Sequence, residues 1–253
     1  MNRRPTSAAD YVIRPCATRD ELAACVTLQK RIWGYSDLEV YPLRLFVNLS
    51  QIGGQVIGAF APDGEMAGFV ASLPAWRDGR RYYHSLSLGV LPEHENRGLG
   101  RALKLEQRRR ALRSGIEWIE WTFDPLRAKN AFFNIVRLGV VCRRYGPNHY
   151  GAVDSRLQRG LPSDRLVAEW WLKSARVRRA LAGKLVRTAR RPAAAEIEIP
   201  VRLDAEKKAR PGWTRALLQT VRGGFQEHFA RGLVVTGFVV EGAAARYLLD
   251  PLE

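Results

Sequence analysis

The residues best suited to chemistry lie between Leu88 and Lys104, in the stretch LGVLPEHENRGLGRALK. An apolar strand ends there at a proline, and a helix-forming run begins after two glycines, Gly98 and Gly100. The first four N–H groups of a helix have no partner within it, and the aligned peptide dipoles add partial positive charge. Glycines let a bulky anion approach the backbone because they lack a Cβ. The junction therefore predicts a phosphate-binding turn.

Three kinds of phosphate-binding loop compete for this spacing. The mononucleotide P-loop is excluded, because it requires a lysine followed by serine or threonine where this chain has Arg101. The dinucleotide fingerprint has Gly98 and Gly100 in place and Glu120 about 20 residues further on, but Leu103 occupies its third glycine position. The third kind is a loop that holds the diphosphate of an acyl-coenzyme A.

Two stretches carry a resemblance to a known family. VLPEHENRGLGRAL resembles the diphosphate-binding motif of the GNAT N-acetyltransferases, in which a strand ending in Val-x-Pro leads to (Gln/Arg)-x-x-Gly-x-(Gly/Ala) at a helix start. DPLRAKNAFFNIVRLG is similar to the segment that follows the fifth strand in that family. The resemblance covers residues 11–146 and extends to a branch with an additional carboxy-terminal region, for which it implies no known substrate.

The resemblance implies that the cofactor is acetyl-CoA or another acyl-CoA. It assigns cofactor binding to Leu88, Val90, Asn96, Arg97, Gly98, Leu99, Gly100, Arg101, Asn130 and Phe133. Two positions depart from the family pattern. Glu95 stands where the family has Gln or Arg, and Ile135 or its neighbour Asn134 stands where many members have the tyrosine that protonates the leaving thiolate. For Asn130, a helix cap is the alternative role.

Direct attack of an amine on a thioester needs a base, because the amine must lose a proton. In the strand before the junction His84 is the side chain that titrates near neutral pH, and Ser85 and Ser87 are alternatives that could anchor a relay water. Tyr145 is the candidate acid for the thiolate, with Tyr150 as the next candidate. For both His84 and Tyr145 the alternative is ordinary packing within a sheet.

The elements that must position these residues follow from the hydrophobic periodicity and from the turn residues. Strands are predicted at residues 11–14, 55–61, 65–73, 81–90, 116–123, 140–145, 165–172, 196–203, 233–240 and 245–249. Helices are predicted at residues 19–33, 42–50, 98–113, 126–138, 174–190 and 213–229. This order predicts an α/β fold with a mixed α+β sheet, in which strand–helix units follow an antiparallel meander. The predicted domains are residues 1–151, which bind acyl-CoA, and 152–253, an α+β region with a basic helix at 173–191.

Composition limits the location and the partners. The chain has 253 residues, a net charge of +16 and three cysteines without the pairing of metal or redox sites, so no metal is expected. No stretch approaches the ~20 apolar residues of a membrane span, so a cytoplasmic protein without membrane contact is expected. The charge predicts attraction to polyanions, and eight of the basic residues fall within 173–191.

Two functions follow from these observations. The first is an acyl-CoA-dependent N-acyltransferase, most simply an acetyltransferase, that acts on a small-molecule or peptide amine. The alternative is a GNAT-like protein without turnover, which docks a polyanion such as RNA through the basic segment. The identity of the acceptor and the oligomeric state, including a homodimer, stay open.

Overall fold

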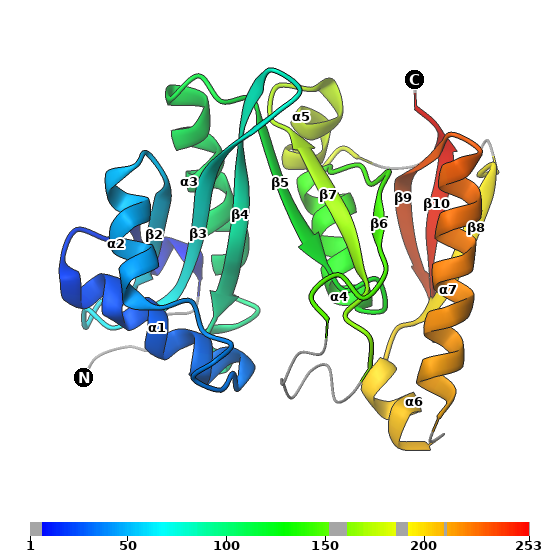
Figure 1. The fold of residues 1–253 in the computed structure, drawn as a ribbon, viewed down its shortest axis with the longest axis horizontal. Coiled ribbons are helices and arrows are strands. Elements are labelled where there is room, and N and C mark those ends of the chain that lie inside the picture. Colours follow the sequence, from blue (N-terminus) through cyan, green and yellow to red (C-terminus); the bar gives the residue numbers. More distant parts are fainter. Residues whose placement is uncertain (1–6, 152–160, 186–191, 210–211, 253) are drawn as a thin grey trace. The chain divides into compact units, whose positions relative to one another are not determined.

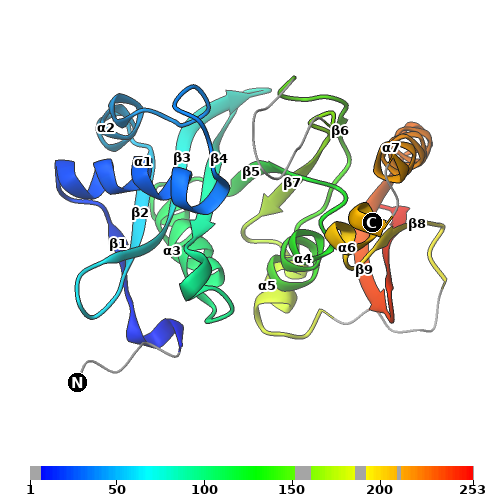
Figure 2. The ribbon, with the colours of Figure 1, turned by 90° about the horizontal axis from the view of Figure 1, so that it is seen from below.

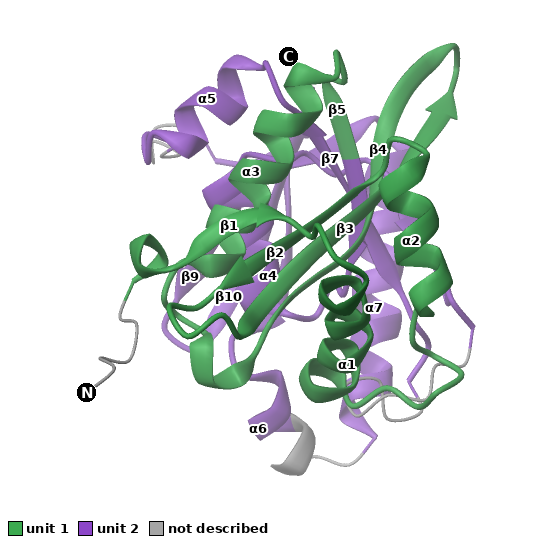
Figure 3. Cartoon of the chain, turned by 90° about the vertical axis from the view of Figure 1, so that its left-hand side faces the viewer, with its two compact units in different colours: residues 1–119, 154–159 green, residues 120–153, 160–253 purple. Residues whose placement is uncertain are grey.

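The computed structural model describes residues 7–151, 161–185, 192–209 and 212–252. The described chain divides into two compact units (Figure 3). Unit 1 contains residues 7–119, and unit 2 contains the described residues from 120 onwards. The domain boundary that we predicted at residue 151 stays a prediction.

Unit 1 is an antiparallel sheet with helices on both faces. Its elements are η1 (Ala8–Asp10), β1 (Val12–Pro15), α1 (Arg19–Trp33), α2 (Leu43–Gln51), β2 (Gln55–Phe60), β3 (Met66–Arg77), β4 (Arg80–Val90), η2 (Pro92–His94) and α3 (Leu99–Arg113). The strands β1 to β4 are neighbours in chain order. Figure 1 shows β2, β3 and β4 side by side. The helices and strands predicted for this part of the chain are confirmed, and β3 is longer than predicted.

The sheet of unit 1 buries apolar side chains on both of its faces. The helices α1 and α2 cover one face and α3 covers the other (Figure 2). Phe46 and Phe69 pack edge to face on the α1–α2 side, with ring centres 6.0 Å apart. Leu99 and Leu103 of α3 pack on the opposite face with Ile57 of β2. Two layers of helix therefore hold β4 and its following turn in place.

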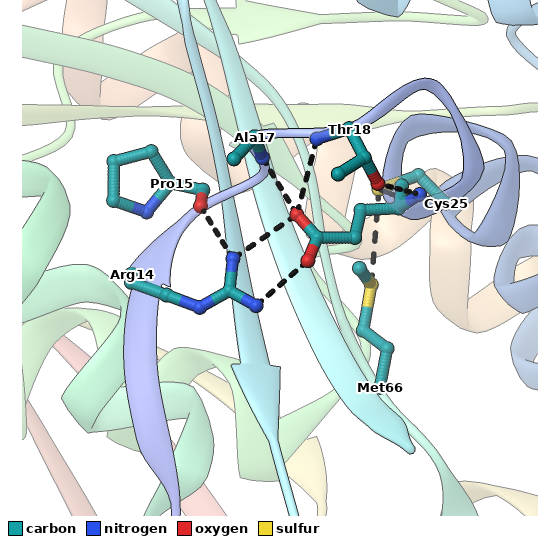
Figure 4. A network of polar contacts seen from close by, with 7 residues as sticks. Arg14, Pro15, Ala17, Thr18, Cys25 and Met66 are labelled. Carbon is teal, nitrogen blue, oxygen red and sulfur yellow. Dashed lines mark hydrogen bonds and ion pairs between the residues drawn. The ribbon is translucent and has the colours of Figure 1, made fainter. Parts of the chain in front are cut away.

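The start of α1 has a capping box. Thr18 accepts a hydrogen bond from the Glu21 amide, and the Glu21 carboxylate accepts from the Thr18 and Ala17 amides (Figure 4). Arg14 of β1 donates two hydrogen bonds to the same carboxylate, at 3.0 and 2.7 Å. The cap therefore also joins α1 to the first strand of the sheet.

The strand β4 contains a bulge. Ser87 lies opposite Ala71 of β3, but Ser85 lies opposite the next residue, Ser72, so that Leu86 has no partner across the ladder. A bulge interrupts the ladder of hydrogen bonds and bends the strand locally, and bulges are frequent beside active sites. This bulge lies between His84 and Leu88, two of the residues that the sequence singles out.

Unit 2 contains a second, three-stranded sheet beside its other strands. Its elements are β5 (Trp118–Phe123, which begins in unit 1), α4 (Ala128–Ala131), η3 (Phe132–Leu138), β6 (Tyr145–Gly146), β7 (Arg165–Trp171), α5 (Ala175–Leu181), β8 (Ala195–Pro200), α6 (Leu203–Ala209), α7 (Trp213–Ala230), β9 (Leu233–Glu241) and β10 (Ala244–Pro251). β5, β7 and β6 are neighbours in this order, and β8, β10 and β9 form the antiparallel three-stranded sheet. The predicted α/β fold with an additional carboxy-terminal α+β region is confirmed.

The strand predicted at residues 140–145 is wrong for most of its length. Val141 bridges to Glu169 of β7, but the next residue, Cys142, bridges to Val235 of β9. The chain changes its partner within two residues, so no continuous ladder forms before β6. The periodicity of apolar residues could not reveal this change, because Val141 and Cys142 are both apolar and fit a single strand equally well.

The basic helix is shorter than predicted. It ends at Leu181, because Gly183 adopts a φ of 70° and donates to the Ala180 carbonyl while the Lys184 amide donates to the Arg179 carbonyl. These two bonds form a Schellman motif, which ends a helix. Residues 186–191 of the predicted helix lie outside the described residues.

Two further predictions, one of a helix and one of a strand, need correction. The helix predicted at residues 126–138 begins at Ala128 and continues after Ala131 as a π-helix, η3. The strand predicted at residues 196–203 ends at Pro200, and α6 follows where no helix was expected.

Among the helices of the described residues, none has the length and apolar character that crossing a lipid bilayer requires.

Candidate functional site

The turn between β4 and α3 presents a series of unused backbone donors. Within the described residues, the amides of residues 97–100 donate to no protein acceptor, whereas the Glu95 amide donates to Pro92 and the Ala102 amide to Gly98. Gly98 has a φ of 85°, which an L side chain rarely adopts, and Asn96 has a φ of 60°. The turn thus offers several unused backbone donors, which a ligand with many acceptor oxygens could occupy.

Apolar side chains anchor the turn from below. Leu99 is 1% exposed, and it packs with Leu103 against Leu88 and Val90 of β4. The side chains of Leu88 and Val90 therefore hold α3 on the sheet. Both side chains are half-buried, and a contact of either residue with a cofactor stays a prediction.

Arg97 supports the turn through its side chain. Its guanidinium donates to the Tyr11 hydroxyl at 2.9 Å and to the Glu93 carbonyl at 2.7 Å. The Tyr11 hydroxyl in turn lies 2.6 Å from Nδ1 of His94. Arg97 thus joins the turn to the segment before β1, while Arg101 lies half-buried in the first turn of α3.

The middle of β4 carries the candidate base and a buried polar cluster. His84 is half-buried opposite Leu73, next to Ser85 at the edge of the bulge. Ser85 accepts hydrogen bonds from Nζ of Lys104 at 3.0 Å and from Nε2 of Gln107 at 3.1 Å. Burial lowers the pKa of Lys104 well below its ordinary value. Ser85 is thus bonded to α3, and Ser87 lies half-buried opposite Ala71 on the other side of the bulge. The roles of His84, Ser85 and Ser87 stay predictions.

The remaining predicted cofactor residues belong to unit 2. Asn130 is exposed on α4, and Phe133 is half-buried in η3. Asn134 and Ile135, which stand near the family's tyrosine position, are buried at 4% and 0% exposure. Neither of these two buried side chains is accessible to a thiolate.

Tyr145 is held by a buried carboxylate. Its hydroxyl donates to Asp164 at 2.6 Å, and burial together with this bond raises the pKa of Tyr145. Arg222 of α7 donates two hydrogen bonds to the same carboxylate, at 2.8 and 2.7 Å. Burial alone would raise the pKa of Asp164, but the bonds from Arg222 and Tyr145 outweigh it and lower this pKa. Tyr145 is thus a weaker acid than an ordinary tyrosine.

Tyr150 is placed differently. Its side chain is 50% exposed, and its hydroxyl lies 2.7 Å from Oγ1 of Thr122 on β5. The guanidinium of Arg165 lies over its ring, 5.3 Å from the ring centre. Arg165 was not among the residues singled out from the sequence, because an arginine at the start of a strand has no distinctive local pattern.

Part of the basic segment has a structural role. Arg176 of α5 donates to the carbonyls of Gly139 and Thr236, at 3.1 and 2.6 Å. Burial lowers the pKa of Arg176 to about 10.

Within the described residues, no group of three or more His, Cys, Asp or Glu side chains is arranged to hold a metal ion.

Residues 18–135 match the model of the acetyltransferase (GNAT) family. The fold is similar to that of the ribosomal-protein-S18-alanine N-acetyltransferase from Escherichia coli, with 17% identity and a TM-score of 0.51 over 65% of this chain and 96% of that chain. It is also similar to yncA from Salmonella typhimurium, an acetyltransferase solved with its cofactor acetyl-CoA, with 20% identity and a TM-score of 0.51 over 65% and 95% of the two chains. At these identities the likeness concerns the fold alone. No curated protein matches the chain.

Proposed function

We propose, from the premise that residues 18–135 form an acetyltransferase domain of the GNAT family, that this chain transfers an acyl group from acyl-CoA to an amine. The simplest acyl group is acetyl. The observation that carries the proposal is the series of backbone amides at residues 97–100, which have no acceptor within the described residues. A diphosphate offers enough oxygens to accept from several of them at once.

Two further features of the turn support binding of the acyl-CoA diphosphate there. Gly98 and Gly100 present backbone without a Cβ, and the helix dipole of α3 favours an anion at this end. The dipole contributes only ~0.3–1 kcal/mol, so the direct N–H bonds must supply most of the affinity. Asn96 and Arg101 flank the amides, and Asn130 and Phe133 are proposed to contact the pantetheine arm.

Bound acyl-CoA supplies an activated thioester. The acceptor nitrogen forms a bond to the carbonyl carbon while the C–S bond breaks, so the amine loses a proton and the thiolate gains one. We assign the base to His84, which lies beside the bulge of β4. The backbone of β4 from the bulge to Val90 is proposed to orient the thioester, and positioning supplies much of the acceleration.

For the acid, the geometry favours Tyr150 over Tyr145. The Tyr145 hydroxyl donates to Asp164, and its pKa is raised. The Tyr150 hydroxyl is partly exposed beside Thr122 of β5. Replacing each tyrosine with phenylalanine separates the two assignments, because loss of the acid lowers kcat by about 100-fold or more.

The proposal is tested by calorimetry with acetyl-CoA. Wild-type protein should bind it, and ligand at 100 times its dissociation constant should add ~2.7 kcal/mol to the free energy of unfolding. Gly100→Val places a branched side chain among the amides and should weaken binding at least about tenfold, or ~1.4 kcal/mol. Gly223→Val is the matched control, because Gly223 is also helical and has open space around it.

Two outcomes would contradict the proposal. Absence of acetyl-CoA binding at millimolar concentration would refute the transferase assignment. Equal affinity of wild-type protein and Gly100→Val would show that the turn before α3 is not the binding site.

A further inference from the structure

The turn before α3 contains backbone conformations that need support. Asn96 and Gly98 both have a positive φ, 60° and 85°, and Arg97 lies between them. Glycine adopts this region of φ freely, but it is uncommon for a residue with a side chain. Such a conformation persists only where the surrounding structure holds it. The backbone of residues 96–98 therefore depends on contacts made from outside the turn.

The side chain of Arg97 supplies such contacts by bridging two parts of unit 1. Its Nη1 donates to the Tyr11 hydroxyl at 2.9 Å, and its Nη2 donates to the Glu93 carbonyl at 2.7 Å. The Tyr11 hydroxyl also lies 2.6 Å from Nδ1 of His94, and Nη1 of Arg97 lies 3.4 Å from the same nitrogen. The guanidinium thus ties the turn to η2 on one side and to Tyr11 on the other.

The segment before β1 is itself fixed against the turn. A Cβ on Gly98 would lie 3.6 Å from the Cβ of Ala8, in ordinary van der Waals contact. Tyr11 is only 6% exposed and packs with Leu99 in the core on the α3 side of the sheet. Its ring meets the His94 ring edge to face, with ring centres 5.7 Å apart. The Tyr11 hydroxyl is therefore a rigid anchor for the guanidinium.

The resemblance assigns Arg97 to cofactor binding, and an arginine at this position can act in two ways. A guanidinium that contacts a phosphate contributes its charge and its donors to the ligand directly. A guanidinium that bridges Tyr11 and the Glu93 carbonyl contributes the shape of the turn. Both terminal nitrogens of Arg97 already donate within the protein, which favours the second way.

We propose that Arg97 and Tyr11 are positioning residues of the acyl-CoA site, whose bridge holds the turn in the conformation that binds the diphosphate. This inference rests on the proposed binding of acyl-CoA at the turn. A turn that already has its binding conformation loses less conformational entropy when the ligand binds, so the affinity is higher. Without the bridge the amides of residues 97–100 are still present, but they are no longer held together for one ligand.

Calorimetry with acetyl-CoA on the full chain tests the bridge. Tyr11→Phe keeps the ring and changes no charge, and it removes only the hydroxyl that anchors Arg97. It should weaken acetyl-CoA binding about fivefold, as the loss of one hydrogen bond does. Arg97→Lys keeps the positive charge but lacks the planar fork that spans both partners, so it should weaken binding by a similar factor.

A double variant and a matched control complete the comparison. Tyr11→Phe/Arg97→Lys should bind at most about twofold more weakly than the weaker single variant, because both changes break the same bridge. Tyr83→Phe is the control, since Tyr83 is 3% exposed and its hydroxyl donates to the Gly53 carbonyl at 2.7 Å, elsewhere in unit 1. This control loses a comparable hydrogen bond and should bind acetyl-CoA as wild type does.

Several results would overturn the positioning role while the transferase proposal stands. Wild-type affinity of Arg97→Lys would show that the charge of Arg97 suffices, as expected for a direct phosphate contact. Wild-type affinity of Tyr11→Phe, or additive losses in the double variant, would show that the bridge does not act as a unit. An equal loss in Tyr83→Phe would indicate a general effect of destabilisation. If wild-type protein does not bind acetyl-CoA, the transferase proposal itself fails, and this inference fails with it.

Discussion

Nζ of Lys104 lies 3.0 Å from Oγ of Ser85 in the core of unit 1, and only 1% of the lysine is exposed. Gln107 accepts a second hydrogen bond from Nζ at 3.0 Å and donates to Ser85. Burial penalises the ammonium form and lowers the pKa of Lys104 well below its ordinary value of 10.5. Folding therefore competes with protonation of this side chain.

Lys104→Met should change how stability depends on pH. Between the lowered pKa of the folded state and 10.5, the unfolded wild-type chain binds one proton more than the folded protein. Wild-type stability therefore falls as the pH falls, by ~1.4 kcal/mol per pH unit from this group. Methionine removes this slope, although the loss of a partner for Gln107 costs ~1–3 kcal/mol at every pH.

Urea denaturation at several pH values checks this prediction, because other titrations are common to both proteins and cancel in the difference. Lys104→Leu should give the same slope as methionine, since neither residue carries a proton. Parallel stability curves for wild type and both variants would contradict the lowered pKa of Lys104.

Arg14→Gln should destabilise the protein only above acidic pH. The pKa of Glu21 is lowered from 4.5 to about 2, most strongly by the hydrogen bonds from Arg14 and further by those from the Ala17 and Thr18 amides. A lowered pKa in the folded state contributes stability that is present above pH 4.5 and is lost as the pH falls toward 2. Because the Arg14 side chain is 41% exposed, we expect a loss of only ~0.5–1 kcal/mol at pH 7.

Thermal unfolding from pH 7 down to pH 2 measures the Arg14→Gln difference, which should shrink across this range. Arg19→Gln is a control on an exposed arginine of α1 and should show no such trend. A difference that persists unchanged at the acidic end would mean that Arg14 acts by packing on Phe60, whose ring centre lies 3.9 Å from the guanidinium carbon.

Sequence patterns predicted unit 1 well because its signals are local. The capping box of Thr18 and Glu21 and the two glycines at the start of α3, Gly98 and Gly100, each act over a few residues. Where structure depends on distant partners, local patterns fail. Val141 and Cys142 are apolar and look like one strand, but they bridge to two different strands.

The same distinction between local and distant causes decides which parts of the candidate site the sequence could predict. The turn of residues 96–101 is visible in the sequence, because glycine spacing at a strand-to-helix junction has a local cause. Lys104 and Arg165 are not visible there. A lysine in an amphipathic helix is ordinarily exposed, and only the tertiary contacts with Ser85 bury it. Arg165 gains its position from Tyr150, which is distant in sequence.

Arg222→Met should destabilise unit 2 strongly. The change removes two hydrogen bonds from a carboxylate that is 1% exposed, so a buried charge loses its main partner. We expect a loss of ~3 kcal/mol, at the lower end for a broken buried pair because Tyr145 and the Asn148 amide still donate to Asp164.

Chemical denaturation compares the free energy of unfolding of Arg222→Met with that of the double variant Asp164→Asn/Arg222→Met. The double variant should recover part of the loss, since asparagine carries no charge. Equal stability of the two variants would indicate that Arg222 contributes by the packing of its side chain and not by balancing the charge of Asp164.

Gly139→Ala should lower the free energy of unfolding more than the same change at Gly183. Both glycines have positive φ, 79° and 70°, so alanine costs ~1–2 kcal/mol of backbone strain at either position. At Gly139 the new Cβ would also lie 2.8 Å from the Cβ of Ala180, whereas at Gly183 nothing lies within 4 Å. Overpacking of this kind adds ~1–3 kcal/mol, because α5 would have to move away from η3. The difference in urea midpoint between the two variants isolates that close approach, and equal midpoints would mean that α5 shifts at no cost.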